Sequence, residues 1–318
     1  MSQKSYKSIW ILLFYILFYS APALAAERYI IGFSQATTTE PWRLLFNQLT
    51  RHEANKHENL TLLVRNAQDS VTKQIADIEE LISRKVDALL VSPKEAEGLT
   101  EIINRASKSG IPVFVLDRDI LNKNYTQFIG GDNTLIGRNA GTFAIDYLGG
   151  KGKAKGVILE IWGGQNSTPA HDRHNGFRDI VDQESGISCL NVKNDGDWKQ
   201  DKAYQIATRA FQTHKNIDLV YAHNDPMAYG AFLAARDLGI EKKMAFIGID
   251  GIPAEGVRWV YDGILDATFL YKTPGGDAIQ QALRHLQGEK INKKLTLPTL
   301  KIDKNNAEQI LRQHGLLN

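Results

Sequence analysis

Three apolar runs that each stop at polar residues constrain the fold of this chain most. They occupy residues 111–116, 219–222 and 246–249. An apolar run without polar alternation is typical of a strand buried on both faces, as in a parallel sheet covered by helices. In open sheets of that kind, ligands bind just beyond the carboxyl ends of the strands. We therefore expect ligand-binding side chains directly after each run.

Hydrogen-bonding side chains stand at these three points. Asp117 and Arg118 follow the first run, Asn224 follows close on the second and Asp250 follows the third. A carboxylate accepts two hydroxyl hydrogen bonds and a guanidinium donates in a planar fork, so both suit a polar ligand. Plainer structural roles compete with ligand binding: a local ion pair for Asp117 and Arg118, a helix cap for Asn224 and a tight turn at Asp250.

Strand and helix signals alternate along almost the whole chain, which predicts parallel sheets joined by crossover helices. For example, we expect Asp69 to cap a helix that runs to about Arg84. The sequence also predicts an extended tail from residue 295 to 302. About 290 residues follow the leader, at the upper limit for a single core, so two domains are expected.

The first 25 residues have the features of a secretory signal peptide. Lys4 and Lys7 precede an apolar run at residues 9–19, and a small-x-small site ends at Ala25. An uncleaved anchor is the alternative, but the run is shorter than the roughly 20 residues that span a bilayer. We expect export to the periplasm and cleavage near Ala25.

The charge balance argues against some partners. The leader holds two of the 38 basic residues and none of the 36 acidic ones, so 38 − 2 = 36 basic residues face 36 acidic ones. A nucleic-acid or membrane-surface partner would require a basic excess. Cys189 is the only cysteine, so no intrachain disulfide forms. We expect a buried structural thiol there rather than a reactive one.

Two further candidates lie outside the strand ends. Arg173 stands within a predicted helix from Pro169 to about Gln183, where a solvated surface role competes. Trp42 follows a polar loop after the first strand, so its ring either stacks on a sugar or belongs to the core. His171 and His174 are spaced like metal ligands without a third partner, and we interpret them as a surface pair. No dinucleotide, triphosphate or hydrolase motif is present, and no cofactor is expected.

With these residues in view, the chain resembles the periplasmic sugar-binding proteins of bacterial ABC transporters, of the ribose/galactose type. Seven matching segments occur in family order, at residues 31–34, 86–93, 110–118, 130–133, 173–177, 222–231 and 248–251. The resemblance implies an α/β fold of two similar lobes, each a parallel sheet sandwiched by helices. A three-segment hinge would join them, with the ligand cleft between.

The resemblance also implies how the chain divides. An N-terminal lobe would hold residues 26–132 and 272–301, and a C-terminal lobe would hold residues 133–271 and 302–318. The chain would cross between them near Asp132, Tyr271 and Ile302.

The family's pattern gives the expected site. Asp117, Arg118, Arg173, Asn224 and Asp250 would bind sugar hydroxyls or the ring oxygen. Trp42 would stack on the sugar, and Ser34 and Gln35 would make polar contacts. Segment 269–274 is one residue longer than the family's, so the last contact falls to Tyr271 or Lys272. Ser92 and Pro93 replace an amide-bearing pattern of ribose binders, which leaves the sugar open: a neutral pentose or hexose in either ring form, or an acidic sugar.

The implied function is monosaccharide capture by hinge closure and delivery to an ABC permease by a monomeric protein. A sensory role, with a membrane histidine kinase or chemoreceptor as the partner, stays open. An exported enzyme with Asp117 and Asp250 as acid and base is the third hypothesis. A repressor is excluded because a signal peptide stands where its DNA-binding helices would be.

Overall fold

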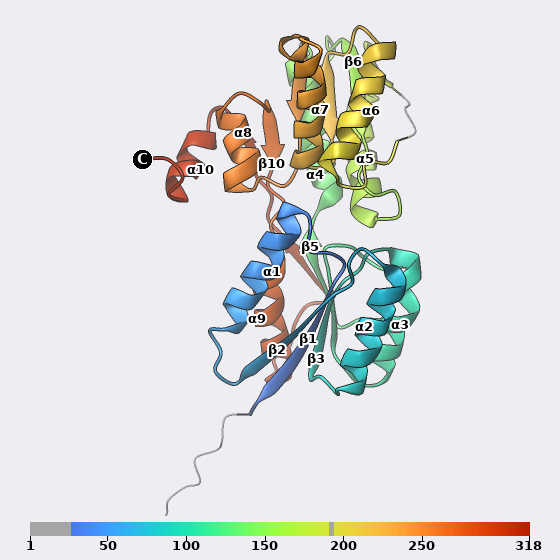
Figure 1. Cartoon of the computed structure of the whole chain (residues 1–318), viewed down its shortest axis with the longest axis vertical. Helices are drawn as coiled ribbons and strands as arrows, with labels where there is room; N and C mark the ends of the chain where they lie inside the picture. Colours follow the sequence, from blue (N-terminus) through green and yellow to red (C-terminus); the bar gives the residue numbers. More distant parts are fainter. Residues whose placement is uncertain (1–26, 191–193) are drawn as a thin grey trace, which may run out of the picture.

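The computed structural model describes residues 27–190 and 194–318. The predicted signal peptide and its cleavage site lie outside these residues. The described chain forms two lobes, each a six-stranded sheet between helices (Figure 1). This confirms the predicted fold class.

The first lobe is built on a wholly parallel sheet in the order β11-β5-β4-β3-β1-β2. Its strands are β1 (Tyr29–Gln35), β2 (Leu60–Asn66), β3 (Ala88–Ser92), β4 (Val113–Leu116), β5 (Gln127–Gly131) and β11 (Lys294–Leu297). Its helices are α1 (Pro41–Ala54), α2 (Val71–Ser83), α3 (Ala96–Lys108) and α9 (Gly275–Leu286). Helices α1 and α9 pack together, as do α2 and α3 (Figure 1).

The second lobe has the strand order β12-β10-β9-β8-β6-β7, parallel except for the antiparallel pair β10 and β12. Its strands are β6 (Gly156–Ile161), β7 (Ile187–Leu190), β8 (Leu219–Ala222), β9 (Ala245–Ile247), β10 (Ala267–Phe269) and β12 (Lys301–Asp303). Its helical segments are α4 (Asn133–Tyr147), α5 (Thr168–Val181), α6 (Gln200–Thr213), α7 (Asp225–Asp237), η1 (Glu241–Lys243), η2 (Pro253–Val257), α8 (Arg258–Tyr261) and α10 (Ala307–Gln313).

The apolar runs are buried on both faces of their sheets. In β4, Phe114 and Leu116 join one hydrophobic cluster, while Val113 and Val115 join another. Successive side chains of a strand point to opposite faces, so an apolar run without alternation follows from helices on both sides.

The chain passes between the sheets three times. It does so between β5 and α4, between β10 and α9, and between β11 and β12 at residues 298–300. Ile302 therefore lies inside β12, beyond the third passage.

One local expectation was wrong, and another was confirmed. Ser70, not Asp69, caps α2, because the Ser70 side chain accepts from the N–H of Lys73. Asp69 has a φ of 66°, and its carboxylate pairs with Lys94. The tail at residues 295–302 is extended as expected. It contributes to two strands in different sheets, because the chain changes lobe between β11 and β12.

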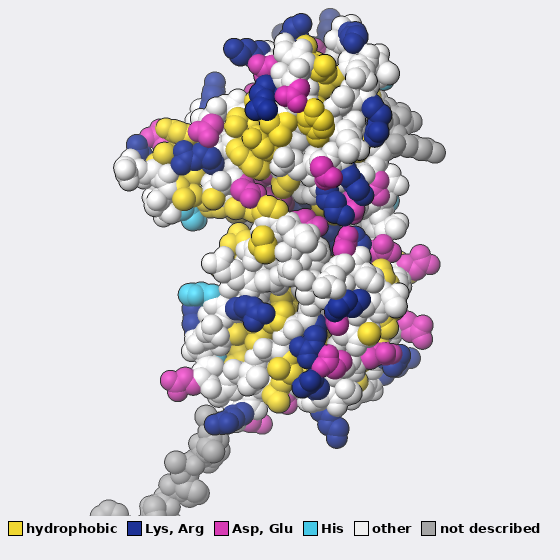
Figure 2. Space-filling view, viewed as in Figure 1, with side chains coloured by type: hydrophobic (Ala, Val, Ile, Leu, Met, Phe, Trp, Pro, Cys, Tyr) yellow, Lys and Arg dark blue, Asp and Glu magenta, His cyan; other side chains and the backbone are white. Residues whose placement is uncertain are grey.

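The burial of Cys189 and the distribution of surface charge both bear on the sequence predictions. Cys189 in β7 is partly buried, and burial raises the pKa of its thiol to about 11, which suits a structural rather than a reactive role. Acidic and basic side chains intermingle on the face shown in Figure 2. Within residues 27–190 and 194–318, no helix combines the length and apolar character needed to cross a membrane.

Candidate functional site

A pocket lies between the lobes at the carboxyl ends of the strands. It holds about 390 Å³ of space not filled by atoms, its opening to solvent included. The first lobe contributes Glu40, Trp42, Arg43, Asp117 and Arg118, the second contributes Pro169, Arg173, Trp198, Asn224 and Asp250, and Tyr271 joins them from a passage between the lobes.

Most of the predicted binding residues line this pocket. They are Trp42, Asp117, Arg118, Arg173, Asn224, Asp250 and Tyr271. Ser34 and Gln35 are fully buried behind it instead. The side chain of Gln35 accepts a 2.6 Å hydrogen bond from Arg43, and Ser34 Oγ accepts one from Gln74. These two residues therefore support the pocket wall.

Asp117 is fixed where β4 ends. Its φ of 67° is a left-handed conformation that is rare outside glycine, and its N–H donates to the carbonyl of Ile129. Arg43 donates to Oδ2 at 2.8 Å, and the Tyr271 hydroxyl donates to Oδ1 at 2.9 Å. Strained backbone persists where its surroundings determine it, often at functional sites. The structure thus holds this carboxylate at the pocket in one orientation.

Arg43 is a pocket residue that the sequence did not single out. Its guanidinium is buried and donates to Gln35, Ser92 and Asp117. The sequence feature that could have identified Arg43 is its place beside Trp42 in the first turn of α1. That helix begins at the carboxyl ends of the strands, shortly after the end of β1.

Arg118 is held by its own lobe. Its NH1 donates to the carbonyl of Lys94 at 2.7 Å, and its Nε lies 3.8 Å from Asp117 Oδ2. Burial and the nearby charge of Arg43 lower its pKa to about 10, so it remains a cation at neutral pH.

Arg173 is fully buried, not solvated. Its Nε donates to Asn133 at 2.9 Å, and NH1 contacts the carbonyl of His223. The guanidinium lies 4.5 Å from the centre of the Tyr271 ring. These contacts require α5 to approach α4 closely. A Cβ on Gly176 would lie 2.1 Å from the carbonyl oxygen of Thr134, so only glycine fits there.

Asn224 combines both of the roles considered for it. Its Oδ1 caps α7 by accepting from Met227, while its Nδ2 donates to the carbonyl of Trp198 at 3.1 Å. The side chain also lines the pocket. Capping therefore fixes the amide where it faces the ligand space.

Asp250 is supported by a second buried acid. Its φ is 142°, and the next residue, Gly251, donates to Asp225 Oδ2 at 2.8 Å. Thr268 donates to Asp225 Oδ1 at 2.6 Å. Burial raises the pKa of Asp225 to about 7, and burial with the Asp225 charge raises the pKa of Asp250 well above its usual value. A protonated Asp250 could donate to a ligand oxygen as well as accept.

Aromatic rings border the pocket from both lobes. Trp42 stacks on Tyr271 at 5.2 Å between ring centres, and its Nε1 donates to the Tyr271 carbonyl at 2.7 Å. It therefore belongs to the packed core as well as to the pocket. Trp198, which the sequence did not single out, lies under the guanidinium groups of Arg118 and Arg173.

Two pocket residues retain unpaired polar atoms. Glu40 Oε2 and Trp198 Nε1 are buried and have no hydrogen-bond partner among the described residues. Buried polar groups normally find partners, so these atoms are candidates for pairing with a ligand. Glu40 occupies the N-cap position of α1 without capping it, which leaves its side chain available.

The remaining sequence candidates lie elsewhere. Lys272 is half-exposed and pairs with Asp277 at 2.9 Å, so Tyr271 is the member of this pair at the pocket. His171 and His174 do not pair with each other: His171 contacts the carbonyl of Gln165, and His174 contacts Glu160. No group of three or more potential metal ligands lies together in the described parts of the chain.

Comparisons with known proteins agree with this architecture. The sequence model of the family described as periplasmic binding protein domain matches residues 31–290 of this chain. The ribose import binding protein of Bacillus subtilis is 29% identical over 274 residues, covering 86% of each chain. The galactofuranose-binding protein of Escherichia coli is 29% identical over 287 residues, covering 87% of this chain and 88% of the relative.

A solved structure shares still more sequence. The fructose-binding periplasmic domain of the hybrid two-component system BT1754 is 36% identical, with a TM-score of 0.86 over 91% of this chain and 95% of that one. The chain belongs to the periplasmic binding protein domain family.

Proposed function

We propose that this protein is a periplasmic solute-binding protein that captures a monosaccharide between its lobes and delivers it to an ABC sugar permease. The observation that carries this proposal is the pocket itself. Its walls come from both lobes, and each wall presents an acid and an arginine: Asp117 with Arg118, and Asp250 with Arg173.

Capture follows from the position of the pocket. A ligand that contacts both walls binds the closed arrangement better than an open one, so it shifts the population toward closure. The three chain connections between the sheets are the segments that would absorb the movement. Closure removes water from the ligand hydroxyls, and each unpaired polar group then costs about 1–3 kcal/mol. This penalty is expected to reject sugars with the wrong stereochemistry.

The ligand class is a neutral monosaccharide, and we favour its furanose form. Both acids and arginines line the pocket, and the aromatic rings offer faces for a sugar ring. The relatives support the ring form: one curated relative and one solved structure are named for galactofuranose, and another structure for arabinofuranose. The three arginines Arg43, Arg118 and Arg173 outnumber Asp117 and Glu40 by one, so an acidic sugar is the alternative ligand class.

A sensory role is the second candidate, because one observation favours it. The 36% identical structure is a domain of a hybrid two-component system. Here the closed protein would dock on a membrane sensor. Co-purification of the sugar-bound protein from detergent-solubilised membranes tests both roles: a permease supports transport, and a histidine kinase or chemoreceptor supports sensing.

We infer binding without turnover. Both carboxylate oxygens of Asp117 already accept hydrogen bonds, from Tyr271 and Arg43. This arrangement orients an acceptor and leaves it poorly placed to carry a proton. Recovery of the bound sugar unchanged after prolonged incubation is the expected result, and a converted sugar would revive the enzyme hypothesis.

We also propose a monomer in the periplasm, processed near Ala25. Light scattering of the purified protein should give the mass of one chain. Mass spectrometry of protein recovered from the periplasmic fraction should show the new N-terminus. A dimer, or an intact leader, would contradict these two proposals.

The proposal is tested by a thermal-shift screen with monosaccharides. A ligand at about 100 times its dissociation constant stabilises the folded state by about 2.7 kcal/mol. At least one sugar should raise the melting temperature of the parent protein. The panel includes sugars that populate furanose forms and uronic acids, so it also decides the ligand class.

A further inference from the structure

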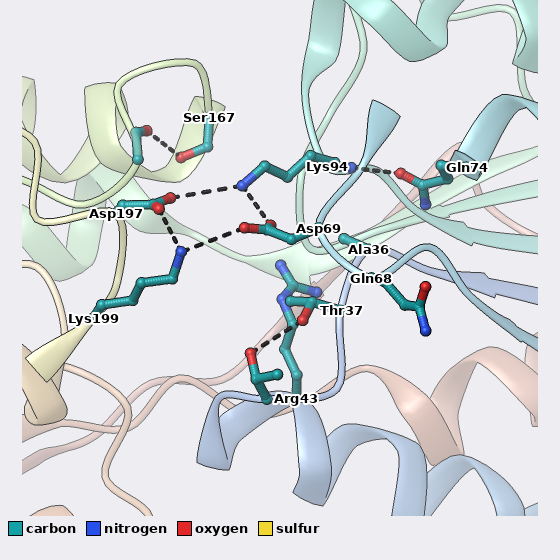
Figure 3. A network of polar contacts seen from close by, with 12 residues as sticks. Ala36, Thr37, Arg43, Gln68, Asp69, Gln74, Lys94, Ser167, Asp197 and Lys199 are labelled. Atoms are coloured by element: carbon teal, nitrogen blue, oxygen red, sulfur yellow. Dashed lines mark hydrogen bonds and ion pairs between the residues drawn. The ribbon is translucent and has the colours of Figure 1, made fainter. Parts of the chain in front are cut away.

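Four charged side chains meet across the opening between the lobes, beside the pocket (Figure 3). Asp69 and Lys94 come from the first lobe, and Asp197 and Lys199 from the second. We name these four residues the interlobe clasp. Within the lobes, Lys94 lies 2.5 Å from Asp69, and Lys199 lies 2.6 Å from Asp197.

The clasp also contains ion pairs between the lobes. Lys94 Nζ lies 3.6 Å from Asp197 Oδ1, and Lys199 Nζ lies 3.4 Å from Asp69 Oδ2. Acid and base therefore alternate around a closed ring with no net charge. Separation of the lobes would keep the two short pairs and break the two longer ones. The interlobe pairs thus depend on closure.

The clasp connects to residues on both walls of the pocket. The Lys94 carbonyl accepts the 2.7 Å hydrogen bond from Arg118. Asp197 directly precedes Trp198, whose ring centre lies 5.6 Å from the Arg118 guanidinium and 5.4 Å from that of Arg173. Movement at either end of the clasp would therefore move a side chain that borders the ligand space.

Burial and backbone conformation show that the clasp is built into the fold. The Lys94 side chain is only 15% exposed and that of Asp197 19%. Asp69, Asp197 and Trp198 all have positive φ angles, of 66°, 48° and 65°. Such conformations persist where the surroundings determine them. Although burial opposes ionisation, bonds from Lys199 and Lys202 hold the pKa of Asp197 at about 2, so the carboxylate is charged at neutral pH.

We propose that Lys94 and Asp197 are positioning residues, which hold Arg118 and Trp198 in place over the bound ligand and slow its release. This inference rests on the proposed function. The inference predicts that ligand release depends on salt, which the contacts of a neutral sugar with the pocket would not by themselves produce. Salt screens ion pairs, so an uncharged ligand should dissociate faster as ionic strength rises.

The test compares Lys94→Met with Lys202→Met. Methionine keeps an unbranched stem of similar length and the backbone groups that bond Gln74 and Arg118, and it removes the ammonium group. Lys202 pairs with the same Asp197 at 3.0 Å from within the second lobe, and it has no ion pair to the first lobe among the described residues. Loss of Lys202 therefore serves as the matched control.

The readout is the dissociation rate of the sugar found in the screen, followed by tryptophan fluorescence in stopped flow. Between about 20 mM and 500 mM salt, the parent rate should rise about three- to tenfold, because the interlobe pairs are long and only partly buried, so salt can still screen them. Lys94→Met should be fast at low salt and should keep only a reduced salt slope, carried by the remaining Lys199–Asp69 pair, while Lys202→Met should follow the parent. A parental salt slope in Lys94→Met, or equal loss of the slope in both variants, would overturn the inference.

A second measurement needs no sugar. Spin labels at the exposed positions Glu97 and Gln205, in a Cys189→Ser background, report the distance between the lobes. Rising salt should lengthen the mean distance in the parent, and should do so less in Lys94→Met, where only the Lys199–Asp69 pair remains between the lobes. If no sugar binds, the proposed function fails while this distance still tests the clasp. If a sugar binds but neither the rate nor the distance depends on Lys94, only the clasp fails.

Discussion

Arg43 donates a 2.8 Å hydrogen bond to Oδ2 of Asp117, and both side chains are buried at the pocket. Arg43 lies in the first turn of α1, and Asp117 directly follows β4, so the pair joins two distant segments of the first lobe. The arginine fixes the carboxylate before a ligand arrives. A pre-positioned acceptor loses less freedom on binding than a mobile one.

Asp117→Asn should weaken sugar binding about tenfold or more, since the amide turns a donor toward Arg43 or toward the sugar. Isothermal calorimetry measures the change. Asp277→Asn, which alters an exposed pair with Lys272 in the same lobe, is the control and should bind like the parent. Unchanged affinity in Asp117→Asn would remove this residue from the site.

Tyr271→Phe should weaken binding about fivefold. The change removes the hydroxyl that donates to Asp117 at 2.9 Å but keeps the ring that stacks on Trp42, and one hydrogen bond contributes about 1 kcal/mol. Tyr204→Phe removes a comparable 2.8 Å bond to Asp237 at the surface and should leave the affinity unchanged. Equal affinities in the two variants would mean that Tyr271 acts through its ring alone.

Gly176→Ala should lower the free energy of unfolding by about 1–3 kcal/mol and weaken binding, because the new Cβ would force α5 away from α4 and displace Arg173. Urea titration gives the stability and calorimetry the affinity. Gly276→Ala in α9 has space, with its nearest neighbour 3.9 Å away, and alanine favours helix. The close packing of the helices would be refuted by a Gly176→Ala protein as stable as Gly276→Ala.

The buried acid pair should leave a signature in the pH dependence of stability. The Asp225 pKa rises from 3.8 in the unfolded chain to about 7 in the fold, so the folded state holds a proton there that the unfolded state has lost. This contribution therefore makes the free energy of unfolding fall as pH rises from about 4 to about 7.

Asp225→Asn removes that titration, and its stability should fall less steeply than the parent's over the same pH range. Urea unfolding at a series of pH values measures the slopes. Asp262→Asn, on an exposed residue, should keep the parental slope. Parallel curves for parent and Asp225→Asn would show that Asp225 does not titrate in this window.

The strand ends were predictable because burial on both faces of a sheet produces an unbroken apolar run in the sequence. The ends of these runs place Asp117, Asn224 and Asp250 at the carboxyl ends of the strands. Arg173 and Trp42 lie in helices, where the spacing of apolar residues does not mark a binding site. Their binding roles were predicted from the family resemblance. Tyr271 could not be separated from Lys272 by sequence, since both follow the same strand. Packing against Trp42 and the hydrogen bond to Asp117 bring Tyr271 to the pocket.

The missed residues share a physical reason. Arg43 and Trp198 acquire their environment only through contacts distant in sequence, with Asp117 and with the two arginines. Gln35 was expected at the ligand but bonds to Arg43, whose burial no local pattern reveals. Such side chains depend on tertiary contacts between segments far apart in the chain, which a linear pattern does not encode.

The most direct test of the account is calorimetric titration of the parent, Asp117→Asn and Asp250→Ala with the monosaccharide selected by thermal shift. The account predicts one site per chain in the parent and at least tenfold weaker binding in each variant, because the two acids face the ligand from opposite lobes. Failure of every monosaccharide to bind the parent, or equal affinity in all three proteins, would contradict it.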